Sequence, residues 1–513
     1  MGLRGRGAAG LRRVPLRSAG VVAGVVALYL GAGVVSTWPA LKQADDSFLA
    51  EGLNGLPGTA APGDHLQTIW QLWLPGHQLA RGEDPIHDPY SFRPEAEPRV
   101  NFAGWPFSLP FWPLHALFGT ILSWNAFVLL GYLGAGGFTF LWLRSVGLGT
   151  GAALVGGLAF ALAPYRVVQA GAGHLLAWTG MLLPLSLWAW ERRRPAVAAA
   201  ALASIPLSGQ VHLALGAIPF FAAYALLRGG SSRWVGGAVA AAAAAGLLVW
   251  ALAIRDSIGE TRSFSGVQRY SADLADFVAR DPRHGLEPFV LLGWLTPLIA
   301  LAGLALVRSR LTLILAIGAV VPVLLALGAN LPGYEALWHL PGLHSTRVPE
   351  RFMPIACLSI AGLAAIAVSR LQWRAAPVIA LLLVALDLRL GVTAVRPTAA
   401  DEDNRAYAAI PNAPLGRLLE LPVRRPNRQE GSVYLYYAMQ APRERPAGYS
   451  TVAPKEAARI LDELRPCADV RTLGDLGVRL LALYGPPRCG VPGRLLARDG
   501  PISLYEAYIP VAW

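Results

Sequence analysis

Residues 19–37 read AGVVAGVVALYLGAGVVST, and this uncharged stretch decides the class of the protein. It has about the 20 apolar residues that a helix needs to cross the hydrocarbon core of a membrane. An arginine-rich segment precedes it, as in signal peptides and signal anchors. Because the sequence shows no clean A-x-A cleavage motif, we expect a retained membrane anchor.

The composition of the whole chain is that of a membrane protein. Of its 513 residues, 54% are hydrophobic and 15% are charged, and the mean hydropathy is +0.44. The net charge of +12 comes from arginine, since lysine occurs only at Lys42 and Lys455. This bias accompanies abundant Ala, Gly, Pro and Val, as in proteins from GC-rich bacterial genomes. We therefore expect membrane lipids as partners and no nucleic acid.

Uncharged stretches separated by arginines predict about eleven transmembrane helices. They lie at 19–37, 123–143, 148–164, 174–190, 195–208, 211–227, 234–254, 288–307, 311–328, 352–369 and 375–395. With a cytoplasmic N-terminus, the arginines between spans fall on alternate, cytoplasmic loops without a break, as the positive-inside rule requires. This phase holds only if 106–122 does not cross. Pro106, Pro110 and Pro113 make that segment a poor spanning helix, and we expect an interfacial or re-entrant helix there.

The predicted topology divides the chain into three parts. Residues 1–18 form a basic cytoplasmic N-terminus, 19–395 a transmembrane domain, and 396–513 an extracytoplasmic domain. The transmembrane domain includes a long first outer loop at 38–122 with interfacial helices. The protein is thus expected to be an α-helical polytopic protein of the bacterial cytoplasmic (inner) membrane.

The last part of the chain loses the apolar pattern of the spans. Strand-like segments at 417–422 and 478–484 flank a helical run at 454–464, which predicts a small α/β domain. Cys467 and Cys489 lie in this domain. They form a disulfide or remain two thiols, and the sequence leaves both alternatives open.

The first outer loop carries candidate catalytic carboxylates. It is about 85 residues long and rich in Trp, Phe and His, which favours a functional loop over a disordered one. Asp64 begins a predicted amphipathic surface helix that also contains His77. Its side chain is either a helix N-cap or a general base or metal ligand. Asp45 and Asp46 are either solvated loop charges or catalytic carboxylates.

Two further outer segments contain arginines at the membrane boundary. Arg166 either reaches lipid headgroups or binds a phosphate through its bidentate fork. His174 heads the next span and would face the same outer side, where all nine histidines of the chain are predicted to lie. Arg347 and Arg351 are four residues apart and can share a helix face. They form a second phosphate clamp or pair with Glu350 and loop acids.

Motifs of soluble enzymes are missing from the sequence. We find no zinc signature, phosphate-binding P-loop, dinucleotide fingerprint or Gly-x-Ser-x-Gly elbow. The chemistry is therefore expected at the outer membrane boundary.

At these residues the chain resembles a known family. The segments Gly63-Asp64…Trp70…His77, Ala163-Pro164-Tyr165-Arg166 with Gly173-His174-Leu175, and Arg347-Val348-Pro349-Glu350-Arg351-Phe352 look like the GT-C fold of polyprenyl-phosphate-dependent glycosyltransferases. More closely, they resemble the uncharacterised bacterial YfhO-like and related GT-C membrane proteins. The tail segments Leu419-Glu420-Leu421-Pro422, Gly448-Tyr449 and Leu476-Gly477-Val478-Arg479 match that pattern too.

The resemblance implies a sugar transfer from a lipid phosphate carrier on the outer face. By position Asp64 is the base or metal ligand, with Asp45 or Asp46 as the fallback, and Arg166 or Arg351 holds the phosphate. His77, His174 and Arg347 complete the expected substrate-binding set. A divalent cation, Mg or Mn, is a candidate cofactor whose ligands are unassigned.

Two other functions remain open from the sequence. A transporter or flippase of a lipid-linked substrate would need polar residues deep in several spans, and most spans are free of charge. An inactive GT-C-like scaffold would act through its tail. Function belongs to the site rather than to the fold, so the site has to decide between these alternatives.

Overall fold

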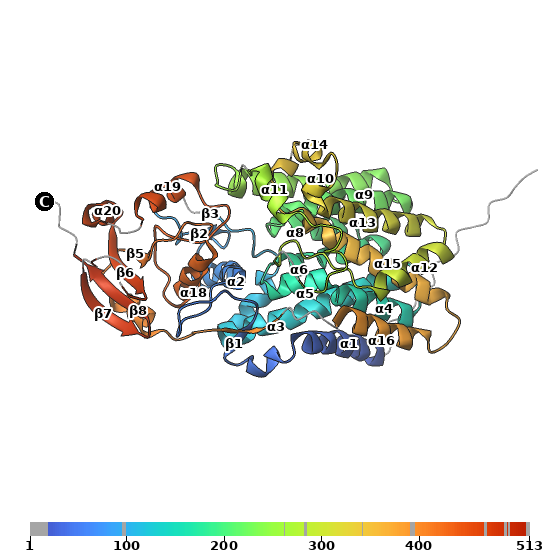
Figure 1. The fold of residues 1–513 in the computed structure, drawn as a ribbon, viewed down its shortest axis with the longest axis horizontal. Coiled ribbons are helices and arrows are strands. Elements are labelled where there is room, and N and C mark those ends of the chain that lie inside the picture. Colours follow the sequence, from blue (N-terminus) through green and yellow to red (C-terminus); the bar gives the residue numbers. More distant parts are fainter. Residues whose placement is uncertain are drawn as a thin grey trace, which may run out of the picture.

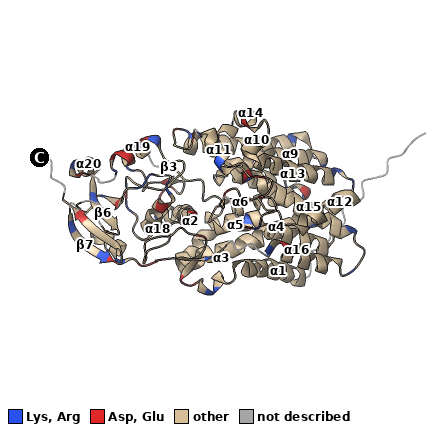
Figure 2. Ribbon diagram, in the orientation of Figure 1, with Lys and Arg blue, Asp and Glu red and all other residues tan. Residues whose placement is uncertain are grey.

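A computed structural model describes residues 19–94, 99–260, 262–281, 285–340, 342–389, 395–465, 469–486, 490 and 493–508. Helices fill one end of the molecule, and a small sheet with flanking helices forms the other (Figure 1). Charged residues are sparse along the helices and frequent at the sheet end (Figure 2). The predicted cytoplasmic segment 1–18 and both tail cysteines, Cys467 and Cys489, lie outside the described residues.

The helical end and the first loop are built from these elements: α1 (Ala19–Thr37), η1 (Ala40–Gln43), β1 (Ser47–Leu49), α2 (Asp64–Ala80), β2 (His87–Asp88), β3 (Arg99–Val100), α3 (Ser108–Ser145), α4 (Thr150–Ala161), α5 (Pro164–Gly171), α6 (Leu176–Thr179), α7 (Leu182–Glu191), α8 (Pro195–Leu207), α9 (Val211–Leu227), α10 (Ser232–Val249), η2 (Trp250–Ile254), α11 (Phe264–Tyr270), α12 (Leu295–Leu306), α13 (Arg310–Ala326), η3 (Gly328–Asn330), α14 (Tyr334–Trp338), η4 (Leu343–Ser345), η5 (Pro349–Phe352), α15 (Met353–Arg370) and α16 (Ala376–Arg389).

Each predicted span contains a helix, but eleven full crossings are not confirmed. Among the described residues, four helical stretches are long and apolar enough to cross a membrane: Ala19–Thr37, Ser108–Ser145, Ser232–Ile254 and Pro349–Arg370. α4 and α5 pass the same test together, although they bend by 44° between them. Several predicted spans break into shorter helices because prolines and glycines interrupt the apolar runs. The chain is a multi-pass membrane protein, and its number of crossings stays a prediction.

The segment expected to be re-entrant forms the first piece of α3. Gly119 breaks that helix with φ 74° and ψ −174°, a conformation that glycine adopts without a Cβ clash. The Glu402 carboxylate then accepts hydrogen bonds from the backbone N–H groups of Thr120 (2.6 Å) and Ile121 (2.9 Å). The apolar continuation of α3 is therefore capped by a residue of the C-terminal part.

The centre of the helical end is α15, the most buried of the long apolar stretches. It packs against α4, α12 and α13. α12 approaches it most closely at Gly303, where a Cβ atom would lie 2.2 Å from the Leu363 carbonyl oxygen. Small residues at such crossings let helix backbones come together where apolar lipid offers no hydrophobic driving force.

The C-terminal part contains these elements: β4 (Pro397–Ala399), α17 (Arg405–Ala408), η6 (Ile410–Asn412), β5 (Arg417–Leu421), η7 (Gln429–Gly431), α18 (Ser432–Gln440), α19 (Lys455–Glu463), α20 (Val470–Asp475), β6 (Val478–Tyr484), β7 (Gly493–Asp499) and β8 (Ile502–Ala507). The sheet order is β5-β6-β8-β7, with β5 and β6 parallel and the other pairs antiparallel. β5, β6 and α19 confirm the predicted strands and helix. β7 and β8 were not predicted. β7 is an edge strand with exposed, charged positions, so it lacks a clear apolar alternation.

The C-terminal part is fastened to the first outer loop. β4 pairs antiparallel with β1, which joins residues about 350 positions apart. α18 packs against α2 (Figure 1), and the Ser432 hydroxyl accepts a hydrogen bond from the Gly63 N–H at 3.0 Å. The start of α2 is therefore held between the helical end and the tail.

A fully buried ion pair lies in the same junction. Arg445 Nη1 donates to Glu420 Oε1 at 2.6 Å, and both side chains have no exposed surface. The Arg445 backbone also pairs with the first loop, through Tyr90 O and Arg93 N, each at 2.8 Å. Since an unpaired buried charge is costly, the pair makes this contact sensitive to either partner.

We predict that Arg445→Ala destabilises the folded tail by about 3–5 kcal/mol, because it leaves the Glu420 carboxylate buried without a counter-charge. Thermal unfolding in detergent, with limited proteolysis of the tail, measures the loss. The matched control is Arg459→Ala, which breaks an exposed pair with Glu463 on α19. That change should cost no more than about 0.5 kcal/mol, and equal effects of both substitutions would contradict the prediction.

Candidate active site

A cavity of about 720 Å³ opens between the helical end and the tail. The segments that line it are those predicted to share the outer side, or lie within a residue or two of them. Its titratable and charged lining residues are Glu51, Asp64, His174, His212, Arg262, Tyr270, Glu287, Arg347, Arg351 and Tyr449. Three of the sequence-predicted substrate-binding residues, His174, Arg347 and Arg351, thus meet Asp64 in one cavity.

Asp64 is the first residue of α2, and the N-cap position before it is Gly63. Its Oδ1 accepts a hydrogen bond from the Tyr449 hydroxyl at 2.6 Å, and its Oδ2 lies 2.7 Å from His174 Nε2. The carboxylate is thus engaged by one side chain from the helical end and one from the tail. Of the two alternatives left by the sequence, the N-cap is not what the side chain does.

Both ring nitrogens of His174 have hydrogen-bond partners. Its Nδ1 lies 2.6 Å from Gln169 Oε1. The same amide oxygen accepts from Arg351 Nη1 at 3.2 Å, and because a guanidinium only donates, the amide must present its oxygen to both neighbours. The ring of His174 is thus held between the Gln169 amide oxygen and the Asp64 carboxylate.

Arg351 completes the network from the start of the most buried span. Its Nη2 donates to Glu287 Oε2 at 2.7 Å, and Glu287 Oε1 lies 3.9 Å from His174 Nε2. Of the two alternatives for Arg351, pairing with loop acids is therefore observed, and Glu350 Oε1 lies 3.7 Å from its Nε. Asp64, His174, Glu287 and Arg351 thus form one connected network, in which each side chain orients its neighbour.

The network controls ionisation of the carboxylates. Burial raises the pKa of Asp64, but the hydrogen bonds and charges of His174, Tyr449 and Arg351 outweigh it and bring the pKa to about 2. Burial likewise opposes ionisation of Glu287, yet Arg351 and His174 leave its pKa below the ordinary value. Burial raises the pKa of Tyr449, and the neighbouring Asp64 raises it further. The site thus holds ionised carboxylates beside a neutral phenol at neutral pH.

A second region of the cavity is basic. Arg347 Cζ lies 5.5 Å from the ring centre of Tyr270, and Arg262 Nη2 donates to the Thr451 carbonyl at 3.1 Å. Neither forms an ion pair with a carboxylate among the described residues. Burial, helped by the charge of Arg347, lowers the pKa of Arg262 to about 10. Two neighbouring cations without a counter-charge are the arrangement of an anion site.

Arg166 does not reach the cavity, contrary to the sequence-based expectation. It is 2% exposed, and its guanidinium donates to the carbonyls of Ala161 (2.9 and 3.2 Å) and Ala177 (3.1 Å). It also lies over the Tyr132 ring. The bend between α4 and α5 frees carbonyls at the end of α4, and Arg166 satisfies one of them. Its role in the structure is to hold that bend.

The other predicted residues lie elsewhere. Asp45 and Asp46 are exposed in the turn before β1, where Asp46 Oδ1 accepts from the Ser47 hydroxyl at 2.8 Å. His77 lies toward the far end of α2, stacked on Trp73 with 4.2 Å between ring centres and 3.0 Å from the Tyr90 hydroxyl. None of them lines the cavity.

Sequence reasoning missed four members of the site: Gln169, Arg262, Glu287 and Tyr449. Gln169 was within reach, because it lies between Arg166 and His174 in a segment already singled out. Tyr449 belonged to a quoted tail motif, but its contact with Asp64 spans 385 positions. No local pattern in one sequence signals such a contact.

The described residues offer a poor ligand set for a metal ion. They contain no group of three or more His, Cys, Asp or Glu side chains that could hold one. Asp64 and Glu287 are the carboxylates nearest His174, and both are already bound by cationic side chains. The predicted Mg or Mn therefore has no ligand set among the described residues.

Solved structures identify the fold: it is the GT-C fold of membrane glycosyltransferases. The arabinofuranosyltransferase AftD from Mycobacteria is similar with a TM-score of 0.58 and 15% identity, over 96% of this chain and 40% of that one. ArnT from Cupriavidus metallidurans gives a TM-score of 0.51 and 15% identity, over 94% of this chain and 98% of that one. This chain therefore spans about two fifths of AftD and nearly all of ArnT.

No model of a known protein family and no curated protein matches the sequence. The predicted GT-C resemblance is confirmed at the level of the fold. The closer likeness to YfhO-like proteins stays a prediction.

The low pKa of Asp64 predicts a pH-dependent contribution to stability. A folded-state pKa of about 2, against an ordinary 3.8, stabilises the fold fully above the ordinary value. The contribution is lost as pH falls toward the folded value, and it amounts to roughly 2 kcal/mol. Unfolding temperatures measured from about pH 5 to pH 2 should therefore fall more steeply for the native protein than for Asp64→Asn. Parallel curves would show that Asp64 is not held ionised.

Proposed function

We propose that this protein transfers a sugar from a polyprenyl-phosphate carrier to an acceptor of the cell envelope, on the outer face of a bacterial cytoplasmic membrane. One observation carries the proposal: a single cavity holds an ionised, positioned carboxylate, Asp64, together with two arginines, Arg262 and Arg347, that have no carboxylate partner in the part of the chain that the structure describes. The GT-C fold supports it.

The donor phosphate would bind at the basic region. Arg262 and Arg347 can each donate two hydrogen bonds to phosphate oxygens, which suits a guanidinium better than an ammonium. As the bond between the sugar C1 and the phosphate oxygen breaks, negative charge grows on the leaving phosphate. Fixed cations at that place stabilise the transition state more than the ground state.

Asp64 would receive the proton of the acceptor hydroxyl. The acceptor oxygen attacks C1 from the face opposite the phosphate and inverts it, while the carboxylate takes the hydroxyl proton. The Tyr449 hydroxyl, 2.6 Å from Asp64 Oδ1, already occupies a position that suits such a donor. When an acceptor hydroxyl replaces this bond, one stabilising donor to the carboxylate is exchanged for the reacting one.

His174, Gln169, Glu287 and Arg351 act on Asp64 through position and charge. Their hydrogen bonds fix the orientation of the Asp64 carboxylate. The charges of His174 and Arg351 help to keep it ionised. Such a network holds the base in its reactive position, so the side chain does not have to rearrange at each turnover.

The alternatives fit the cavity less well. A flippase needs polar groups through the depth of the helical bundle, whereas the charged lining here comes from loops and helix ends at the tail-facing end of the helices. A scaffold has no use for two half-buried arginines in the same cavity as an engaged carboxylate. We include two further points in the proposal: the acceptor is a glycan, lipid or protein of the envelope, and the tail lies on the outer side of the membrane.

Replacing the carboxylate tests the chemistry. Asp64→Asn should lower transfer by about 10²–10⁴-fold, because the amide cannot accept the proton, while donor binding stays near the native level. The assay supplies radiolabelled pentoses and hexoses on short-chain polyprenyl phosphates to protein in lipid nanodiscs. Native-level transfer by this variant would overturn the assignment of Asp64.

Replacing an arginine tests the phosphate site. Arg347→Ala should weaken binding of the phosphate donor about 10–100-fold, the loss expected for charge-assisted hydrogen bonds, and Arg347→Lys should restore part of it. Arg269→Ala is the matched control, since Arg269 is exposed on α11 and does not line the cavity. Equal losses in both alanine variants would point to general electrostatics instead of a site.

A further inference from the structure

A smaller side pocket of about 160 Å³ adjoins the cavity. The residues that line it but not the cavity include Trp70, Asp88, Phe92, Asn101 and Phe102, with Val249 and Ile254 from the end of α10 and from η2. It shares a wall with the cavity, formed by Gln67, Gln71, Ala103, Gly209, Tyr449, Ser450 and Val452. A ligand in one space therefore lies next to a ligand in the other.

The face of α2 leads from the carboxylate into the side pocket. Asp64, Gln67 and Gln71 are three and four residues apart, so they lie on one side of the helix. Asp64 lines the cavity, and both glutamines line both spaces. From Asp64 to Gln71 the helix rises about 10 Å. An extended ligand can thus follow this face from the reacting carboxylate into the side pocket.

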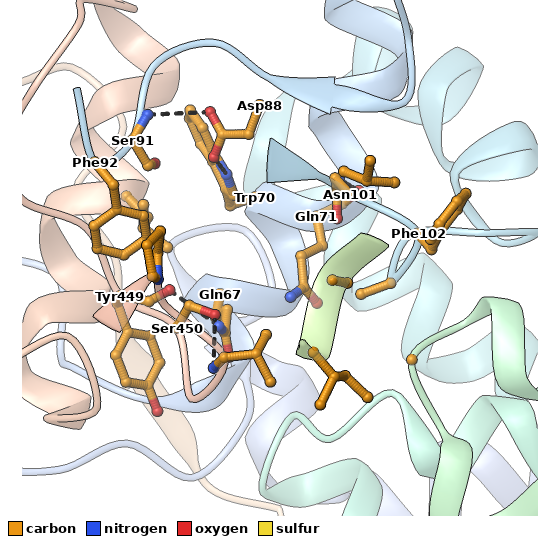
Figure 3. Close-up of a pocket in the computed structure, with 18 of the residues that line it drawn as sticks. Gln67, Trp70, Gln71, Asp88, Ser91, Phe92, Asn101, Phe102, Tyr449 and Ser450 are labelled. Atoms are coloured by element: carbon orange, nitrogen blue, oxygen red, sulfur yellow. Dashed lines mark hydrogen bonds between the residues drawn. The ribbon is translucent and has the colours of Figure 1, made fainter. Parts of the chain in front are cut away.

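The pocket offers aromatic surfaces and uncharged polar groups. Figure 3 shows Phe92 and Phe102 on opposite sides, with Gln71 and Asn101 between them. The side-chain amide of Gln71 makes no hydrogen bond among the described residues. Asn101 uses only its Nδ2, which donates to the backbone carbonyl of Gln71 at 3.2 Å. Aromatic faces beside free amides suit the C–H faces and hydroxyls of a sugar ring.

The single charged side chain of the pocket is occupied. Asp88 Oδ1 accepts from the N–H groups of Tyr90 (2.9 Å) and Ser91 (3.2 Å), and its Oδ2 accepts from Trp70 Nε1 (3.3 Å). No free charge among the described lining residues faces the space. The chemistry therefore selects a neutral ligand, in contrast to the charged cavity beside it.

Phe92 is held in the pocket wall against its backbone preference. Its φ of 60° is in the left-handed region, which a bulky side chain rarely adopts. Its ring packs on Gly448, where a Cβ atom would lie 2.8 Å from the ring. Strained residues persist where the surroundings impose them, and they cluster at ligand sites. Here the surroundings are the hydrophobic core of the tail: the Phe92 ring is 4% exposed and belongs to the same core cluster as Leu419, Val423 and Ala447. The more accessible aromatic face of the pocket is that of the half-buried Phe102.

We propose that the side pocket binds a neutral sugar ring of the acceptor, so that the acceptor is a glycan chain whose terminal hydroxyl reaches Asp64. This inference rests on the proposed function for the role of the ring as acceptor. Binding of the sugar itself does not depend on transfer.

The test uses the full chain in lipid nanodiscs and methyl glycosides of neutral gluco-, galacto-, manno- and arabino-disaccharides as probes. Saturation-transfer NMR should show binding of at least one disaccharide. Phe102→Leu, which keeps an apolar side chain but removes the aromatic face, should weaken that binding about tenfold, and Asn101→Ala should act similarly. Phe118→Leu is the matched control, because Phe118 is exposed on α3 outside the pocket.

The outcomes separate this inference from the proposed function. Disaccharide binding that depends on Phe102 and persists in Asp64→Asn supports the pocket even if no transfer is found. Transfer with an unchanged acceptor KM in both pocket variants overturns the pocket while leaving the proposed function intact. Absence of disaccharide binding also overturns the pocket assignment. Binding of 1-octanol in place of the sugars overturns it as well and marks the pocket as an acyl-chain site.

Discussion

The carboxylate of Asp64 depends on two partners that the chain must bring from opposite directions. His174 comes from the helical end and Tyr449 from the tail, and they bind different oxygens of the same group. The strand pair of β1 with β4 and the contact of α18 with α2 keep these two parts in place. The rest of the cavity follows from this constraint, because the segments that line it all converge on the start of α2. The buried pair of Arg445 with Glu420 reinforces the same junction from the tail side.

The sequence carries the membrane architecture because hydrophobicity and arginine placement are local properties. Each predicted span contains a helix, and β5, β6 and α19 lie where the tail pattern placed them. The number of crossings was harder to predict, because an apolar run does not reveal where Pro164 or Gly119 breaks its helix. Such a break requires a partner for the freed backbone groups. Arg166 and Glu402 are these partners, and they come from another turn and another part of the chain.

The site was predictable only in part, and the reason is distance along the chain. Asp64, His174, Arg347 and Arg351 stand in short motifs at the outer ends of helices, so one sequence suffices to select them. The sequence could not distinguish Arg351, which faces the cavity, from Arg166, which is turned into the bundle, because both lie at the boundary of an apolar span. Glu287 and Arg262 lie in a loop with no pattern of its own. Their roles appear only when the fold places them beside residues that were already suspected.

The contact between Asp64 and Tyr449 also sets an order of events during synthesis. The two residues are 385 positions apart, so a ribosome that has released the first loop must add most of the chain before the second partner emerges. Chains of this size fold in stages as they are made. Until the tail arrives, β1 has no partner strand and the carboxylate lacks one of its two donors. A chain that ends before β4 would therefore lack both the strand that pairs with β1 and the tyrosine that binds Asp64, so its centre would stay incomplete.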